Sequence, residues 1–288
     1  MPDINLNYGI LYICPTPIGN LEDITLRVIK TLKEVNIIAA EDTRHTKKLL
    51  NHLEINTPLI SYHEHNKDKK NEEIIEILKK GESIALVSDA GMPAISDPGE
   101  ELVKLAIEKQ IKIIPLPGAN AALTALIASG LTNSPFTFIG FLPKTAKKRQ
   151  QMLKNLKAYN HALIFYEAPH RLLETLNDIL TIIGDKQVII ARELTKKFEE
   201  FIRDKLSNII DNFAEITCKG EFTIIVNNEL EEIEVSENKL SNLEIIKKVN
   251  FLISQGENKK DAIREVASKY NIARRTVYQA VIKNTTAD

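Results

Sequence analysis

Short apolar runs alternate with amphipathic segments along most of this 288-residue chain. The apolar runs have strand length, and the segments between them have helical periodicity. The expected strands are 10–15, 36–40, 83–88, 111–116, 136–141, 161–167, 187–192 and 221–226. The expected helices are 23–34, 43–52, 67–80, 99–109, 119–129, 146–157, 170–183 and 204–213. Such alternation predicts an α/β fold, with largely parallel strand pairing in the first part.

The pattern changes beyond Val226. An acidic stretch from Glu229 to Glu237 has the character of a linker. Three short helices are expected after it, at 239–254, 258–269 and 274–284. Asn271 stands at a tight turn between the last two helices, and this pattern is typical of a helix-turn-helix. We therefore expect domains at 1–117, 118–230 and 239–288, and Thr132-Asn-Ser-Pro135 is a further candidate for a break between the first two.

The composition narrows the class of protein. With 43% hydrophobic and 27% charged residues, the chain resembles a soluble globular protein. No apolar run approaches the roughly 20 residues of a membrane span, and the N-terminus lacks a secretory signal pattern. Cys14 and Cys218 have the spacing of neither a disulfide framework nor a zinc site. We expect a cytoplasmic protein with no membrane partner and no metal.

Charge is unevenly distributed along the chain. Residues 236–288 hold ten Lys or Arg and six Asp or Glu, a net charge of +4, and the whole chain carries −1. The remaining residues 1–235 therefore carry −5. A basic tail favours contact with nucleic acid, whereas a helical appendage that packs on the body is the competing interpretation.

Three strand ends run into loops rich in Gly, Pro and small polar residues, at 14–20, 88–99 and 115–120. The second is the most informative, because Gly91, Pro93, Pro98 and Gly99 fall within nine positions. Such a loop beside a helix N-terminus gathers backbone N–H groups that suit a small anionic ligand. Its carboxylates, Asp89 and Asp97, suit ammonium or hydroxyl groups. Three loops of this kind predict one ligand site at the carboxyl edge of an open sheet.

The segment Glu41-Asp-Thr-Arg-His-Thr46 concentrates ionisable side chains at another strand end. It suits the orientation of a sugar or phosphate, or the removal of a proton from a hydroxyl group. It equally suits a structural role, in which Asp42 caps the next helix and Arg44 pairs with it. Glu41 and Asp42 also mimic the acidic ribose contact of a nicotinamide site, but the preceding loop lacks the three-glycine pattern.

Basic side chains cluster at three further places. Four follow the apolar run 136–142, two end another strand, and two begin the last helix beside Tyr278. Such groups bind nucleic-acid phosphates, although a solvated helix start explains the first cluster equally well. The RNA-binding candidates are Lys144, Lys147, Lys148, Arg149, His170, Arg171, Arg274 and Arg275.

Seven ordered motifs, spread over residues 9–227, resemble those of the ribosomal RNA small subunit methyltransferase I family. They are Thr16-Pro-Ile-Gly-Asn-Leu-Glu-Asp-Ile-Thr-Leu26, Ala40-Glu-Asp-Thr-Arg44, Val87-Ser-Asp-Ala-Gly-Met-Pro-Ala-Ile-Ser-Asp-Pro-Gly99, Phe138-Ile-Gly-Phe-Leu-Pro143, Tyr166-Glu-Ala-Pro-His-Arg171, Ala191-Arg-Glu-Leu-Thr-Lys196 and Lys219-Gly-Glu-Phe222. The chain departs from the family at Met92, where Thr is common, and at Ala119-Asn120, where Pro-Ser is usual.

The resemblance implies two α/β domains of tetrapyrrole-methylase type with S-adenosylmethionine in the cleft between them, a homodimer, and no obligatory metal. It implies methylation of the ribose 2′-hydroxyl of a cytidine in the decoding region of 16S rRNA. The residues that it places at the cofactor are Pro17, Gly19, Asp89, Gly91, Met92, Pro93, Ile95, Pro117, Gly118 and Ala119, with 131–135 near the adenosine. Our hypothesis for the proton-handling and ribose-orienting group is Glu41, Asp42 and Arg44.

Two alternatives remain at this point. A methyltransferase of the same fold that acts on a small tetrapyrrole would have no need of the basic tail. A ligand-sensing transcription regulator would use 258–284 to bind DNA and the body to bind an effector.

Overall fold

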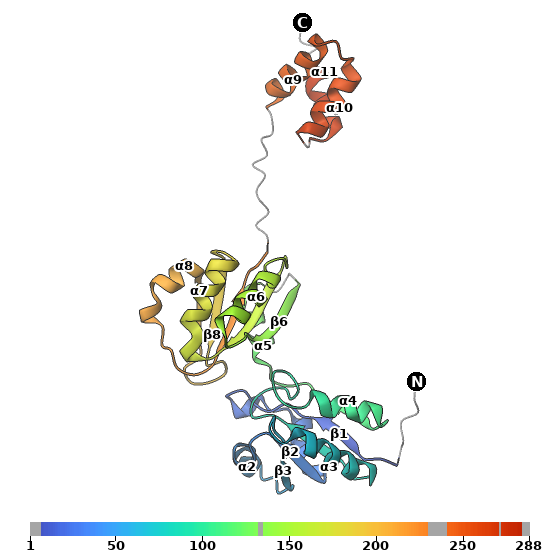
Figure 1. Ribbon diagram of the computed structural model, residues 1–288, viewed down its shortest axis with the longest axis vertical. Helices are drawn as coiled ribbons and strands as arrows, with labels where there is room; N and C mark the ends of the chain where they lie inside the picture. Colours follow the sequence, from blue (N-terminus) through green and yellow to red (C-terminus); the bar gives the residue numbers. More distant parts are fainter. Residues whose placement is uncertain (1–6, 132–134, 230–240, 271, 284–288) are drawn as a thin grey trace. The chain divides into compact units, whose positions relative to one another are not determined.

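The computed structural model describes residues 7–131, 135–229, 241–270 and 272–283 (Figure 1). These residues belong to two compact units, 1–229 and 230–288. The first unit holds two five-stranded sheets, and the second holds helices. The predicted boundary between residues 117 and 118 falls inside the first unit, just after the last strand of its first sheet.

The first sheet is parallel and has the strand order β3-β2-β4-β1-β5. Its central strands are short, apolar and buried, because helices cover both faces of a parallel sheet. Its strands are β1 (Ile10–Ile13), β2 (Ile37–Ala40), β3 (Leu59–Ser61), β4 (Ile84–Val87) and β5 (Lys112–Pro115). The order places β1 and β4 side by side at the centre, so that the loops after them meet at the carboxyl edge.

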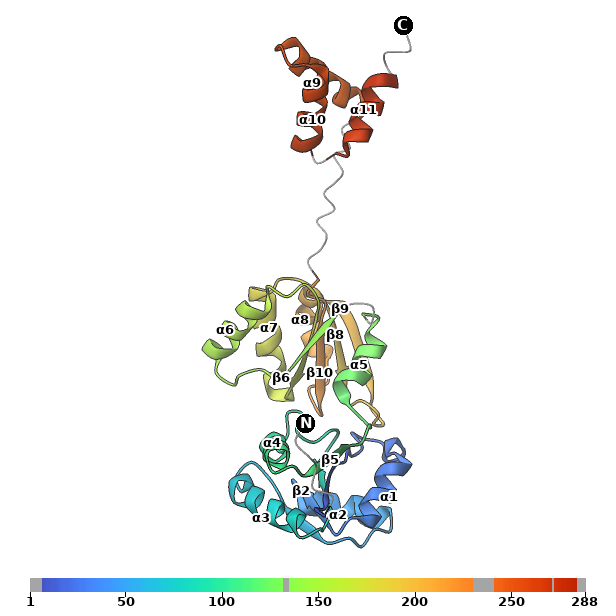
Figure 2. The ribbon, with the colours of Figure 1, turned by 90° about the vertical axis from the view of Figure 1, so that its right-hand side faces the viewer.

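Helices cover both faces of this sheet (Figure 2). On one face Val28 and Leu32 of α1 (Leu26–Glu34) and Leu50 of α2 (Thr43–His52) pack on the strands. On the other face the buried side chains come from α3 (Lys67–Lys79) and α4 (Glu100–Glu108). Helix starts follow capping rules, since Thr25 accepts from the Val28 N–H and Asp42 from the Arg44 N–H.

The second sheet is mixed and has the order β6-β7-β10-β8-β9. Only β6 and β7 pair in parallel, and the other pairs are antiparallel. Its strands are β6 (Phe136–Phe141), β7 (Ala162–Glu167), β8 (Gln187–Arg192), β9 (Glu200–Lys205) and β10 (Phe222–Val226). One face packs against α6 (Ala146–Leu156), α7 (Leu172–Ile182) and α8 (Leu206–Asp211), and the other against α5 (Ala121–Ser129). Short 3-10 helices lie at Leu21–Asp23, Pro169–Arg171 and Phe213–Glu215.

The second unit contains α9 (Asn242–Ser254), α10 (Lys259–Lys269) and α11 (Arg274–Lys283). Its own small core is built from Ile245 and Val249 of α9, Ile263 and Val266 of α10, and Val277 of α11. Ser241 and Glu244 form a reciprocal capping box at the start of α9. The three predicted tail helices are confirmed, whereas Asn271 and most of the linker 229–237 lie outside the described residues.

The eight expected strands and the parallel pairing of the first part are confirmed, and two strands were missed. β3 spans three half-buried residues, too few to show a period. β9 is a charged, largely exposed edge strand, and its sequence reads as a polar loop. The candidate break at 132–135 lies mostly outside the described residues.

Candidate active site

The loops after β1 and β4 are joined to each other by hydrogen bonds. The Thr16 N–H donates to the Gly91 carbonyl oxygen at 2.9 Å, and the Gly91 N–H donates to the Thr16 carbonyl oxygen at 3.0 Å. The Thr16 hydroxyl donates to the Ser88 carbonyl oxygen at 3.0 Å. These bonds hold the two loops as one rigid rim at the carboxyl edge of the first sheet.

The loop 88–99 has an unusual backbone. Gly91 and Gly99 have φ values of +79° and +141°, and two residues with side chains, Ala94 (+65°) and Ser96 (+64°), also occupy the left-handed region. Such conformations carry a cost for residues other than Gly, and they cluster where a site imposes its shape on the chain. At Gly91 an added Cβ would lie 3.3 Å from Ile18 and 3.6 Å from the Ala119 carbonyl oxygen.

A cavity of about 390 Å³ opens beside this loop. Its first-sheet lining is Ile18, Glu41 and residues 89–92 and 95–97, and its second-sheet lining is Phe141 and residues 166–169 and 220–223. Asn120 and Ala121, at the start of α5, complete the wall. The cavity therefore combines strand ends of both sheets, and its size suits one nucleoside-sized ligand.

The lining is acidic. Glu41, Asp89, Asp97, Glu167 and Glu221 contribute carboxylates, and none of the described lining residues is Lys or Arg. This charge does not favour the small anion that we expected at the loop. The Gly91 N–H is already bonded to Thr16, and the surrounding carboxylates favour a cation.

Two of these carboxyl groups have perturbed acidity. Burial, with the negative charge of Glu41 acting in the same direction, raises the pKa of Asp97 to about 7. Burial likewise raises the pKa of Glu41, with the charge of Asp89 acting in the same direction. Titratable groups with raised pKa values inside a cavity are typical of functional sites.

The three predicted catalytic residues separate in the structure. Glu41 lines the cavity, but Asp42 and Arg44 do not. Asp42 caps α2 and binds the Arg44 guanidinium at 2.8 Å, and this hydrogen bonding lowers the pKa of the Asp42 carboxyl. The Arg44 side chain is 89% exposed, so these two residues fit the structural interpretation of the segment.

The predicted cofactor residues divide in a similar way. Asp89, Gly91, Met92 and Ile95 line the cavity, whereas Pro17, Gly19, Pro93, Pro117, Gly118 and Ala119 do not. Two of the latter group allow the loops to pack closely. A Cβ on Gly19 would lie 2.7 Å from the Thr195 hydroxyl oxygen, and one on Gly118 would lie 2.5 Å from the Pro15 ring. The described part of the segment 131–135 also lies outside the lining.

Sequence reasoning missed the second-sheet wall of the cavity. Tyr166 packs edge-to-face with Phe138 and Phe141 at 5.0 and 5.7 Å between ring centroids. Its hydroxyl oxygen accepts from the Ala122 N–H at the start of α5 at 3.2 Å, and burial raises its pKa. Phe138, Phe141 and Tyr166 lie in two of the family motifs, 138–143 and 166–171, which could have indicated this wall. Only basic residues were selected from these segments as site candidates.

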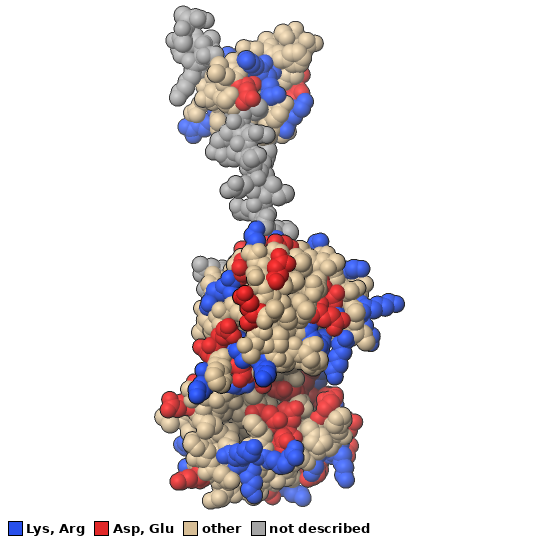
Figure 3. Space-filling view, turned by 90° about the vertical axis from the view of Figure 1, so that its left-hand side faces the viewer, with Lys and Arg blue, Asp and Glu red and all other residues tan. Residues whose placement is uncertain are grey.

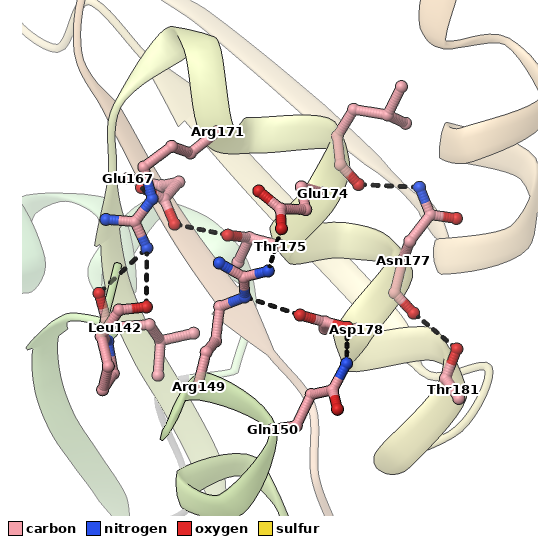
Figure 4. A network of polar contacts seen from close by, with 12 residues as sticks. Leu142, Arg149, Gln150, Glu167, Arg171, Glu174, Thr175, Asn177, Asp178 and Thr181 are labelled. Atoms are coloured by element: carbon pink, nitrogen blue, oxygen red, sulfur yellow. Dashed lines mark hydrogen bonds and ion pairs between the residues drawn. The ribbon is translucent and has the colours of Figure 1, made fainter. Parts of the chain in front are cut away.

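Two of the predicted RNA-binding arginines are internal (Figure 4). Arg149 is fully buried and pairs with Glu174 and Asp178, each at 2.6 Å. The expectation that it belongs to an exposed basic cluster is wrong, because it faces α7 rather than solvent. Arg171 donates to the carbonyl oxygens of Leu142 (3.0 Å) and Pro143 (3.2 Å) and lies 3.5 Å from Glu167.

The other basic candidates are exposed. Lys144, Lys147, Lys148 and His170 lie on the surface of the first unit. On one face of this unit groups of Lys and Arg side chains lie beside groups of Asp and Glu (Figure 3). In the second unit a shallow cavity of about 570 Å³ has a basic lining of Lys259, Lys260, Arg274 and Arg275, with Ile263 and Tyr278 between them.

The part of the chain that the structure describes lacks two features. It contains no helix with the length and apolarity needed to cross a membrane. In that same part, no group of three or more His, Cys, Asp or Glu side chains is arranged to hold a metal ion.

Comparison with known proteins shows the family. Residues 10–210 match the family model of tetrapyrrole (corrin/porphyrin) methylases. The chain is 53% identical, over 94% of its length and 93% of the relative, to ribosomal RNA small subunit methyltransferase I of Halalkalibacterium halodurans. The relative of the same name from Bacillus subtilis is 52% identical, with 94% of each chain covered. The chain belongs to the ribosomal RNA small subunit methyltransferase I family. As a member of this family it is a methyltransferase.

Solved structures of proteins with low sequence identity to this member of the ribosomal RNA small subunit methyltransferase I family show the same fold. Diphthine synthase has a TM-score of 0.60 at 12% identity, with 76% of this chain and 89% of that chain covered. Cobalt-precorrin-4 methyltransferase, a cobalamin biosynthetic enzyme, has a TM-score of 0.58 at 15% identity, with coverage of 75% and 94%. A uroporphyrin-III C-methyltransferase from Thermus thermophilus, solved with S-adenosylhomocysteine, has a TM-score of 0.54 at 15% identity, with coverage of 76% and 98%. The predicted two-sheet tetrapyrrole-methylase fold is therefore confirmed.

Proposed function

We propose that this methyltransferase transfers a methyl group from S-adenosylmethionine to the ribose 2′-hydroxyl of a cytidine in the decoding region of 16S rRNA. The relatives named above act, by name, on small-subunit ribosomal RNA, and one fold relative was solved with S-adenosylhomocysteine. The observation that carries the proposal is the acidic cavity between the strand ends of the two sheets.

The chemistry of the lining fits this cofactor. S-adenosylmethionine carries a positive sulfonium and an ammonium group, and Glu41, Asp89 and Asp97 supply negative charge on the first-sheet side. The cofactor supplies the reactive methyl group, and the protein supplies alignment and electrostatics. The same lining disfavours a porphyrinoid substrate, because uroporphyrin carries several carboxylates and the described lining offers no Lys or Arg to bind them.

Transfer to a hydroxyl group needs an in-line approach of the oxygen and removal of its proton. Glu41 is the proposed proton acceptor, because it lines the cavity and its raised pKa brings it closer to neutrality. Asp97, with a pKa of about 7, is a second carboxylate in reach of the same space. Asp42 and Arg44 hold the start of α2, which follows Glu41 directly in the chain.

Basic surfaces outside the cavity are proposed to bind the RNA. They are Lys144, Lys147, Lys148 and His170 in the first unit, and Arg274 and Arg275 with Lys259 and Lys260 in the second. We further propose a homodimer and a cytoplasmic location, where small ribosomal subunits are assembled.

Methyl transfer is tested by incubating the protein with labelled S-adenosylmethionine and unmethylated 30S subunits, with a porphyrinoid as the control substrate. Label in 16S rRNA, at a ribose 2′-oxygen mapped by mass spectrometry, supports the proposal. Label in the porphyrinoid alone would establish the alternative activity. A Glu41→Gln variant that keeps its single-turnover rate would remove Glu41 from the chemistry.

A further inference from the structure

Phe141, the last residue of β6, is a large apolar side chain at the mouth of the cavity. It is 54% exposed although it belongs to the cavity lining. Phe136, at the other end of the same strand, is 43% exposed and does not line the cavity. An exposed aromatic ring at the edge of a cavity whose charged groups are carboxylates is a surface on which a planar, uncharged group can stack.

The ring of Phe141 is held in place by its neighbours. It lies edge-to-face against Tyr166 at an interplanar angle of 62°. Tyr166 in turn packs on Phe138 and is tied to α5 through the Ala122 N–H. These contacts fix the position of the Phe141 ring and leave more than half of the residue open to solvent.

The backbone that follows Phe141 is also fixed. Arg171 donates to the carbonyl oxygens of Leu142 and Pro143, the next two residues (Figure 4). Glu167 lies 3.5 Å from the Arg171 guanidinium and accepts a hydrogen bond from the Thr175 hydroxyl at 2.5 Å. Arg171 is thus a positioning residue that keeps the end of β6 from moving away from the cavity.

The distribution of charge indicates which part of a nucleotide contacts the Phe141 ring. Carboxylates inside the cavity repel a phosphate group. Exposed lysines follow immediately outside, with Lys144 three residues after Phe141 and Lys147 and Lys148 in the first turn of α6. The phosphates of an RNA strand are therefore drawn to the lysines, and only an uncharged base and its ribose suit the cavity mouth.

We propose that Phe141 is the stacking platform for the base of the substrate nucleotide at the mouth of the cavity. The inference rests on the proposed function, and it adds a base-binding subsite to it. An RNA base presented in this way has left its own stack, and the aromatic face replaces the stacking that it loses. Because every base has a π-face, this contact orients the nucleotide with little selection among bases.

The absence of tryptophan from the sequence provides a direct test. A Phe141→Trp variant carries a single tryptophan at the cavity mouth, and a Phe136→Trp variant carries one at the far end of the same strand. Each is titrated with a short oligocytidylate in the presence of S-adenosylhomocysteine. We expect saturable quenching of tryptophan emission in Phe141→Trp, little change in Phe136→Trp, and no quenching by ribose 5-phosphate. Equal quenching in both variants, or none in either, overturns the proposal.

Methylation of 30S subunits supplies the second measurement. Phe141→Leu is expected to lower kcat/KM by roughly 5- to 150-fold, the range of one base–aromatic stack, while Phe141→Tyr restores it. The sedimentation coefficient stays as in the wild type. A change in sedimentation with kcat/KM unchanged would assign Phe141 to contact with a second copy of the chain, and would overturn the proposal.

The two proposals can fail separately. If the wild type methylates no RNA but the quenching difference persists, the base subsite stands and the assigned reaction falls. If RNA is methylated at the same kcat/KM by Phe141→Leu and by the wild type, the reaction stands and the base subsite falls.

Discussion

The side chain of Asp89 accepts a hydrogen bond from the backbone N–H of Asp42 at 3.0 Å. Asp89 follows β4 and Asp42 follows β2, so the bond ties two neighbouring strand ends together beside Glu41. Asp89 therefore has two roles. It is a hydrogen-bond acceptor within the fold, and it is a negative charge in the cavity lining.

Two substitutions separate the roles of Asp89. Asp89→Asn keeps a carbonyl oxygen that can accept from Asp42 but removes the charge, so we expect weaker binding of S-adenosylmethionine and an unfolding free energy near that of the wild type. Asp89→Ala removes the acceptor as well and is expected to lower the unfolding free energy by about 1–2 kcal/mol. Calorimetric titration and urea unfolding measure the two effects. Unchanged cofactor affinity in both variants would contradict the electrostatic role.

The raised pKa of Asp97 predicts a pH dependence of cofactor binding. Its carboxyl is neutral well below pH 7 and ionised above it, because burial raises its pKa to about 7. Binding of the cationic cofactor is therefore expected to tighten several-fold between pH 6 and 8. The Asp97→Asn variant should show a flatter profile over this range, measured by calorimetry. If cofactor affinity changes with pH in Asp97→Asn as it does in the wild type, the group that titrates is a residue other than Asp97.

The same group affects folding stability. The folded state retains a proton that the unfolded state, with an ordinary pKa of 3.8, loses. Stability contributed by this proton is fully present below about pH 4 and is lost as the pH rises to about 7. Asp97→Asn removes this loss, so its melting temperature relative to the wild type should rise from pH 4 to pH 8. A difference in melting temperature between Asp97→Asn and the wild type that does not change with pH would argue against a raised pKa of Asp97.

Arg149 is expected to contribute to folding stability and not to RNA binding. Arg149→Ala leaves Asp178, whose side chain is 14% exposed, with Gln150 but no cation as its partner, while Glu174 is 60% exposed and can be hydrated. We expect a loss of about 3 kcal/mol in unfolding free energy, at the low end for a broken buried ion pair. The adjacent, exposed Lys148→Ala is the control and should change stability by less than about 0.5 kcal/mol. If Arg149→Ala weakens RNA binding and leaves stability unchanged, the internal role is wrong.

The exposed lysines predict a change in salt dependence. Each phosphate contact that is lost should reduce the slope of log affinity against log salt by about 0.7–1. The double variant Lys147→Gln/Lys148→Gln is therefore expected to lower the slope by up to about 2, and Arg274→Gln/Arg275→Gln by a similar amount. Filter binding to 30S subunits across a salt series measures both. A slope that neither pair alters would place the RNA contacts on other residues.

Much of the fold was predictable because local patterns agree with it. The buried strand β4 is a continuous apolar run, and β10 has a single Thr among apolar residues. Helix α2 begins and ends where its capping residue and periodicity indicate. The edge strand β9 was not predictable, since its alternating charges meet solvent and carry no burial signal. Glu41, Asp89 and Gly91 could be selected as site residues because they end strands of a parallel sheet, whose carboxyl ends share one edge.

The sequence by itself determined the α/β class, the three tail helices and the family motifs, because each of these depends on patterns among residues that are close together in the chain. Only the tertiary structure decided that Arg149 turns inward to Glu174 and Asp178, that Asp42 and Arg44 lie outside the cavity, and that Phe141 stands at its mouth. The physical reason is that a side chain's exposure and charge environment depend on residues far away in the chain. Basic residues in one run can therefore face solvent or the interior according to what packs against them.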